Sequence, residues 1–158
     1  MKKTFLLIVC LLISAGLFGY LITGLIQEDL SGFFSGAIHL PSGFPSEDGL
    51  ISIWVFLLSL SGFAAWLVSG NAVSINRRKN ALIIFLIFIG AIYGWNLLLF
   101  TDGNLIGSLA MAVAGLLLGL LSTVMFWLID HNAGYLLFPS LVWNLFSLYL
   151  NISLVVLN

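Results

Sequence analysis

The sequence has few charged residues, and none of them lies inside its long apolar runs. Charged residues make up 7% of the 158 positions, whereas 61% are hydrophobic. Proton relays, ion-coupled transport and voltage sensing depend on ionisable groups within the membrane, so these functions are excluded. A soluble domain of this length cannot bury so much apolar surface. The chain is therefore expected to be an integral membrane protein with a single domain, residues 1–158.

Cysteine and histidine are also scarce. The single cysteine, Cys10, lies in an apolar run, so a disulfide framework and a thiolate metal site are both excluded. His39 and His131 are predicted on opposite sides of the membrane, where they cannot form one site. Because no nucleophile–base pair lies in the apolar segments, we expect no metal, no catalytic residue and no enzymatic activity. The net charge of −1 also argues against a nucleic-acid partner.

Five apolar segments are long enough to cross a lipid bilayer as helices of about 20 residues. They are predicted at residues 5–26, 49–69, 80–100, 104–129 and 135–157. The first follows Lys2 and Lys3 and is similar to a secretory signal peptide. Because it has spanning length and no evident cleavage site, we interpret it as an uncleaved first helix. The predicted fold is an all-α bundle of five transmembrane helices.

The charged residues separate into two sets when these five helices are placed across a membrane. Lys2, Lys3 and residues 77–79 fall on one side, together with Asp130. The remaining acidic residues fall on the opposite side: Glu28, Asp29, Glu47, Asp48 and Asp102. Because basic residues mark cytoplasmic loops, we expect a cytoplasmic N-terminus and an external C-terminus, in the plasma membrane of a prokaryote.

Only the first loop, residues 27–49, is long. It contains Pro41 and Pro45 together with several glycines and phenylalanines. Such a long and apolar loop is typical of a lid, so we expect it to cover the outer mouth of the bundle. His39 lies in this predicted lid, which leaves a haem-ligand role open beside the simpler role of a solvated loop residue.

The last apolar segment carries polar side chains that a simple membrane anchor would not need. Trp143, Ser147 and Asn151 are four residues apart and share one helix face. A polar group without a partner in lipid costs on the order of 1 kcal/mol or more, so this face is expected to meet another helix or a cavity. Asn96, Asn144 and Asn151 are accordingly interpreted either as interhelical hydrogen-bonding residues or as ligand contacts.

Three motifs together resemble the tryptophan-rich sensory protein/translocator protein (TspO/MBR) family of five-helix membrane proteins. The fifth helix of that family follows the pattern A-G-x-L-L-x-P-Y-x-x-W-x-x-F-A-x-x-L-N. The residues in register with it include Ala133, Gly134, Pro139, Trp143, Phe146 and Asn151. Trp95 matches the third-helix pattern A-L-x-x-F-x-x-Q-L-x-x-N-x-x-W. Trp54 matches the second-helix pattern V-W-x-x-L-Y, which follows a proline-bearing loop as it does here.

Several polar or aromatic positions of these patterns hold other residues in this chain. Phe88 and Ile92 stand at the glutamine and asparagine of the third helix. Leu58 stands at the tyrosine of the second helix, and Ser140 at the tyrosine after Pro139. We therefore identify the chain as a divergent member. A more apolar lining should favour a lipid-like or isoprenoid ligand over a carboxylated porphyrin.

The resemblance implies a ligand pocket that the five helices enclose and the first loop covers. Members of the family bind porphyrins, haem-like tetrapyrroles, sterols and synthetic aromatic ligands, and they are commonly homodimers. The residues that the resemblance places around the pocket are Trp54, Trp95, Trp143, Ser147, Asn151, Phe88, Ile92, Leu58, Pro41 and Pro139. A bound porphyrin or haem-like tetrapyrrole is thereby implied as a ligand, and no resident cofactor is expected.

Two functions remain as hypotheses. In the first, the protein is receptor-like and binds a hydrophobic or aromatic small molecule on its indole rings, with a sensory, regulatory or transport role. In the second, it is a structural or regulatory subunit whose helices only pack, and Gly115, Gly119 and residues 122–123 serve oligomerisation. A transporter is compatible only with passive passage of a hydrophobic solute, because no charged site could drive coupling.

Overall fold

The described part of the chain consists of helices and short connections, without a strand. The computed structural model describes residues 33, 36 and 38–158. The helices are α2 (Glu47–Gly70), α3 (Ile75–Asn96), α4 (Leu105–Trp127) and α5 (His131–Leu157). A π-helix of five residues, η1 (Leu97–Thr101), continues α3. Four membrane-length apolar helices result, with α3 and η1 forming one of them.

The four segments predicted after the first loop are confirmed as helices, although their ends differ. α3 begins at Ile75, so the basic residues 77–79 lie in its first turns rather than in a loop. α5 begins at His131 because the carboxylate of Asp130 accepts the backbone N–H groups of Asn132 and Ala133. The predicted first segment, residues 5–26, and residues 27–32, 34–35 and 37 of the long loop lie outside the described residues.

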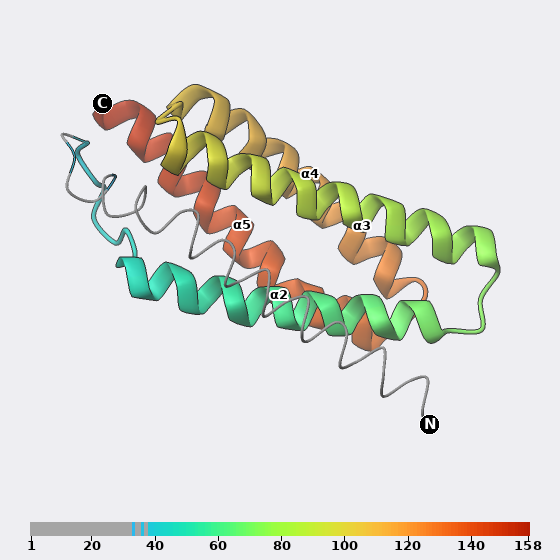
Figure 1. Cartoon of the computed structure of the whole chain (residues 1–158). Coiled ribbons are helices and arrows are strands. Elements are labelled where there is room, and N and C mark those ends of the chain that lie inside the picture. The colour runs from blue at the N-terminus through green and yellow to red at the C-terminus, as the bar shows by residue number, and fades with distance from the viewer. Residues whose placement is uncertain (1–32, 34–35, 37) are drawn as a thin grey trace.

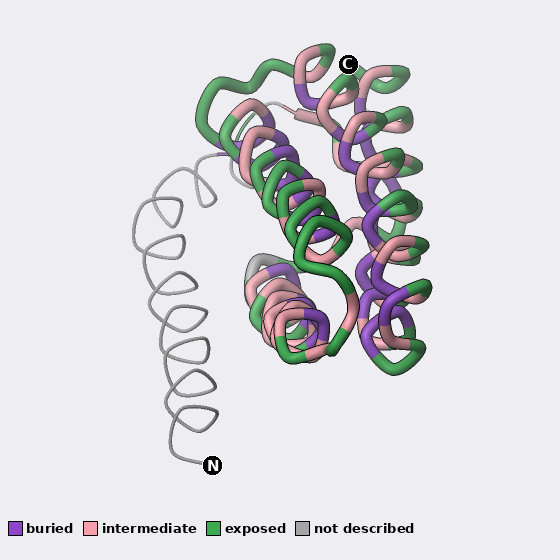
Figure 2. Tube along the Cα trace, turned by 90° about the vertical axis from the view of Figure 1, so that its right-hand side faces the viewer, coloured by how far each residue is buried: buried purple, intermediate pink, exposed green. Residues whose placement is uncertain are grey.

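α4 and α5 form the centre of the bundle (Figure 1). α4 packs between α3 and α5, and α5 also packs along α2. Consecutive helices run antiparallel, as their short connections require. Figure 2 shows the exposed residues on the outer sides of the helices. Many of these exposed side chains are large and apolar, such as Leu86, Leu117 and Leu145, as contact with lipid requires.

The small-residue face of α4 is occupied inside the bundle. A Cβ atom on Gly119 would lie 2.9 Å from the Phe88 ring, and one on Gly115 would lie 3.4 Å from the side-chain oxygen of Asn144. Ser122, on the same face, is fully buried. The glycines thus let α4 approach α3 and α5 closely. This face is not available to a second copy, contrary to the oligomerisation role considered for it.

Two buried hydrogen bonds between side chains tie α5 to its neighbours. The Ser108 hydroxyl on α4 donates to Oδ1 of Asn151 over 2.8 Å. The hydroxyls of Ser61 on α2 and Ser140 on α5 are 3.1 Å apart and share a hydrogen bond. Such bonds inside a membrane bundle fix the register of the helices that they join.

The segment that precedes α2 lies against the end of the bundle at which α5 ends. The Asn158 side chain accepts a hydrogen bond from the His39 N–H over 2.8 Å and donates one to the His39 carbonyl over 3.2 Å. Residues of this segment also pack on the apolar cluster around Trp95. They are Ile38, Leu40 and Phe44. This end of the bundle, called the loop side below, is therefore covered by the described part of the first loop.

Candidate functional site

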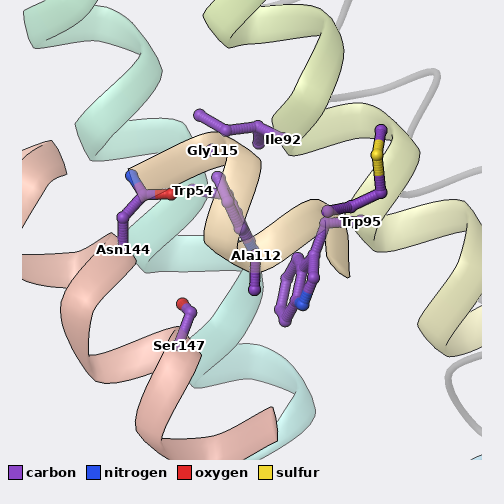
Figure 3. Close-up of a pocket in the computed structure, with 8 residues that line it drawn as sticks. Trp54, Ile92, Trp95, Ala112, Gly115, Asn144 and Ser147 are labelled. Atoms are coloured by element: carbon purple, nitrogen blue, oxygen red, sulfur yellow. The ribbon is translucent and has the colours of Figure 1, made fainter. Parts of the chain in front are cut away.

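Among the described residues, two small cavities between α2, α3, α4 and α5 share part of their lining. The loop-side cavity is lined by Trp54, Ile92, Trp95, Met111, Ala112, Gly115, Asn144 and Ser147 (Figure 3). The deep cavity lies about one helical turn farther from the loop and is lined by Trp54, Leu57, Leu58, Ser61, Ile89, Ile92, Ser140, Trp143 and Asn144. In each, about 10 Å³ is open to the centre of a water molecule. Each cavity therefore has room for about one water molecule.

Trp54, Ile92 and Asn144 line both cavities and form the partition between them. The Trp54 ring centroid lies 6.0 Å from that of Trp95 and 6.4 Å from that of Trp143. Three indoles from α2, α3 and α5 thus meet at the partition. Figure 3 shows Asn144 reaching into the site from α5 and Ile92 from α3.

Four polar side-chain atoms at the site are hydrogen-bond donors without a partner among the described residues. Nε1 of Trp54, Trp95 and Trp143 and Oγ of Ser147 are buried, and none has a hydrogen-bond partner in the described part of the chain. An indole N–H can only donate, and an unpaired buried donor costs about 1–3 kcal/mol. Folded proteins rarely leave such groups unpaired, so these four donors distinguish the site from the rest of its surroundings.

The amide of Asn144 is held by its own helix. Its Nδ2 donates to the Ser140 carbonyl over 2.7 Å, and its oxygen faces Gly115 on α4. Asn96 is held in the same way, because its Nδ2 donates to the Ile92 carbonyl over 2.9 Å. These bonds fix both side chains in the bundle without joining two helices.

The structure brings six of the predicted site residues to the cavities: Trp54, Trp95, Trp143, Ser147, Ile92 and Leu58. Phe88 instead lies in the apolar core, because Gly119 leaves space for its ring against α4. Asn151 is 1% exposed and pairs with Ser108. Pro139 lies inside α5 and lines neither cavity.

Pro41, the remaining predicted residue, belongs to the loop. Its carbonyl accepts the Phe44 N–H over 3.1 Å, which closes a turn in the segment before α2. Pro41 lines neither cavity, and neither do Phe88, Asn151 and Pro139. That these four residues contact a ligand stays a prediction.

The sequence analysis did not find the residues that α4 contributes. Met111, Ala112 and Gly115 form that side of the loop-side cavity. Small or flexible apolar residues on a membrane helix have the same sequence signature whether they face lipid or a pocket. Only the position of Gly115 within a pair of glycines indicated a close contact there.

No charged side chain lines either cavity. His39 is exposed on the loop, and His131 packs against Trp127 at the opposite end of α5, with ring centroids 5.2 Å apart. Within residues 38–158, no cluster of histidine, cysteine and carboxylate side chains could hold a metal ion. The candidate site is thus an uncharged, donor-rich and aromatic pocket.

Asn151→Leu is expected to lower stability and to leave ligand binding unchanged. The substitution removes the bond between α4 and α5, and such bonds contribute about 0.6 kcal/mol on average in a membrane bundle and up to about 1.7 kcal/mol. The melting temperature in detergent measures the effect. Ser153→Ala is the control, because it removes only an exposed bond to the Tyr149 carbonyl within α5. Lost binding at an unchanged melting temperature would place Asn151 in the ligand site instead.

Long apolar helices around a buried, uncharged site define a multi-pass integral membrane protein. The family model of the TspO/MBR family matches residues 7–157. The chain therefore belongs to the TspO/MBR family, and the resemblance found in its motifs is confirmed. A comparison with curated proteins gives no match.

Proposed function

We propose that this protein is receptor-like and binds a neutral hydrophobic or aromatic small molecule between α2, α3, α4 and α5, with a sensory, regulatory or transport role. One observation carries the proposal: the buried N–H groups of Trp54, Trp95 and Trp143 and the hydroxyl of Ser147 lack partners at the cavities. A ligand with carbonyl or ether oxygens would supply the acceptors. The indole rings would supply flat apolar surfaces for stacking.

The lining favours a neutral ligand over a dicarboxylic porphyrin. A buried carboxylate without a nearby cation costs several kcal/mol, and neither cavity has a lysine or arginine in its lining. A porphyrin would have to keep its carboxylates outside the cavities. His39 is exposed and lines neither cavity, so it is not placed to ligate a haem iron there.

Binding requires the cavities to widen, because each now has room for about one water molecule. Met111 is suited to this change, since an unbranched thioether side chain can adopt several shapes at low cost. The end of the Met111 side chain lies against Gly94 on α3. Any side chain at Gly94 would collide with the Met111 methyl group. A shift of Met111 would enlarge the loop-side cavity without moving a helix.

The alternative is a structural or regulatory subunit whose helices only pack. Under that function, the three buried indole N–H groups around the site would have at most water as a partner. The proposal contains no catalytic step. It includes the homodimer implied by the family, which would have to use a surface other than the glycine face of α4.

The proposed orientation places the loop side outside the cell, with the C-terminus. Residues 77–79 lie at the α2–α3 end of the bundle, and Asp48 and Asp102 lie at the loop side. Basic residues favour the cytoplasmic side, so the N-terminus would be cytoplasmic and the membrane would be the plasma membrane of a prokaryote.

Trp95→Phe is expected to weaken ligand binding about 2- to 10-fold, because it removes one hydrogen-bond donor from the loop-side cavity. The experiment titrates the purified protein in detergent with menadione, a neutral aromatic diketone, and follows tryptophan fluorescence. Protoporphyrin IX is titrated in parallel. N-acetyltryptophanamide in the same detergent corrects for quenching without binding.

Trp127→Phe is the matched control, because Trp127 packs on Tyr135 and His131 and lines neither cavity. The wild type should show saturable quenching by menadione, and Trp127→Phe should keep its affinity. No saturable response to menadione, or an equal loss in both variants, would contradict the proposed site. Tighter binding of protoporphyrin IX than of menadione would contradict the neutral ligand.

A further inference from the structure

The two cavities differ in the polarity of their walls. The loop-side cavity has polar surface, with Ser147 and Asn144 in its lining. The deep cavity exposes almost no polar surface, although the hydroxyls of Ser61 and Ser140 lie at its wall. Those two hydroxyls bond to each other. Paired in this way, the two hydroxyls can lie against a hydrocarbon group without being left unsatisfied. The N–H groups of Trp54 and Trp143, which also line this cavity, have no such partner.

The two cavities are arranged end to end along the helices. Trp54 and Ser61 are seven residues apart on α2, and Ser147 and Ser140 are seven residues apart on α5. At 1.5 Å per residue, both helices give a combined site about 10 Å long. Because Trp54, Ile92 and Asn144 form the whole partition, side-chain movement there would join the cavities into one elongated site.

Three of the positions at which this chain departs from the family patterns meet in the deep cavity. They are Leu58, Ile92 and Ser140. The patterns have tyrosine, asparagine and tyrosine at these positions, so each side chain here is smaller or less polar. The departures come from α2, α3 and α5, far apart in the sequence, and they converge on one wall. The deep cavity is therefore a feature of this chain's own residues.

We propose that the deep cavity is a subsite for the apolar tail of an amphipathic ligand. The ligand has a flat, neutral head that offers acceptor atoms to the indole and Ser147 donors of the loop-side cavity. Its hydrocarbon tail passes Trp54 and Asn144 and ends at the Ser61–Ser140 pair. This inference rests on the proposed function, because it assigns the chemical class of the ligand at the same site.

The test compares two probes that share one head. Menadione has the naphthoquinone head alone, and its analogue carries a chain of two isoprene units on the ring. Both are titrated into the detergent-solubilised protein by tryptophan fluorescence. In Ser140→Tyr, the tyrosine ring should fill the deep cavity and exclude the tail. The prenylated probe should then bind about 10-fold more weakly, since losing the contacts of even one methylene group in an apolar pocket lowers affinity by about that factor. Menadione has no tail to place in the deep cavity, so the substitution should change at most one weak contact with it. Its affinity should stay within about 2-fold of the wild-type value.

Ser61→Met fills the same cavity from α2 and gives a second reading if Ser140→Tyr does not fold. Ser59→Met is the matched control, because the Ser59 hydroxyl bonds to the Val55 carbonyl and the residue lines neither cavity. Loss of the tail-dependent affinity in the cavity variants, but not in the control, supports the subsite. If filling the deep cavity changed the affinity of neither probe, the tail subsite would be overturned, while the proposed function would stand. No saturable binding of either probe to the wild type would instead overturn the proposed function itself.

Discussion

Gly119→Leu should melt at a temperature about 5–10 °C below the wild type. A Cβ atom at this position would lie 2.9 Å from Cε2 of the Phe88 ring. That ring is 1% exposed and packs beside Phe85, so it has no free space into which to move. Overpacking of a buried contact costs about 1–3 kcal/mol, and leucine adds three more carbon atoms beyond the Cβ.

Gly90→Leu is the matched control for this experiment. Gly90 lies in α3, is exposed, and has no atom within 4 Å of a Cβ position. Leucine there should be neutral or stabilising by up to about 1 kcal/mol, because it favours the helix more than glycine does. Circular dichroism melts and the molar mass in detergent are measured for both variants. If Gly119→Leu kept its melting temperature but lost a dimer, the α4 face would serve oligomerisation after all.

The hydrophobic runs of the sequence predicted four of the helices well, because lipid forces every backbone group into hydrogen bonds within its own segment. Their ends were less predictable, since capping residues decide where a helix begins. Asp130 starts α5 four residues before the predicted position. Asn104 was predicted inside a span but caps α4, where its side chain accepts the Gly107 N–H. Such caps depend on local geometry that hydropathy does not report.

The site was only partly predictable from the sequence. The family resemblance placed Trp54, Trp95 and Trp143 around the pocket, and all three line the cavities. Asn151 was assigned two possible roles, interhelical hydrogen bonding or ligand contact, because its helix face alone does not show which partner lies opposite. That partner, Ser108, is set by the register of α4 against α5. A pattern within one helix thus identifies polar faces but not the residues that satisfy them.

Trp54→Phe is expected to weaken menadione binding about 10- to 100-fold while stability changes little. Trp54 lines both cavities and contacts the other two indole rings, so the substitution removes a donor and reduces stacking surface at the partition. The substitution lowers stability because phenylalanine fills less space than tryptophan in the folded protein. The substitution also removes the buried N–H of Trp54, and the cost of about 1–3 kcal/mol that this unpaired group carries offsets the loss.

The measurements are the menadione titration and the melting temperature of the same preparation. Trp66→Phe is the control on the same helix, because Trp66 stacks on Phe63 with centroids 5.3 Å apart and lines neither cavity. Trp54→Phe should weaken both menadione and the prenylated probe, since Trp54 lines the cavity of the head as well as that of the tail, whereas Ser140→Tyr should weaken only the prenylated probe. A large loss of stability with no loss of affinity would show that the indole cluster only packs the bundle. The receptor-like function would then fail at its central residue.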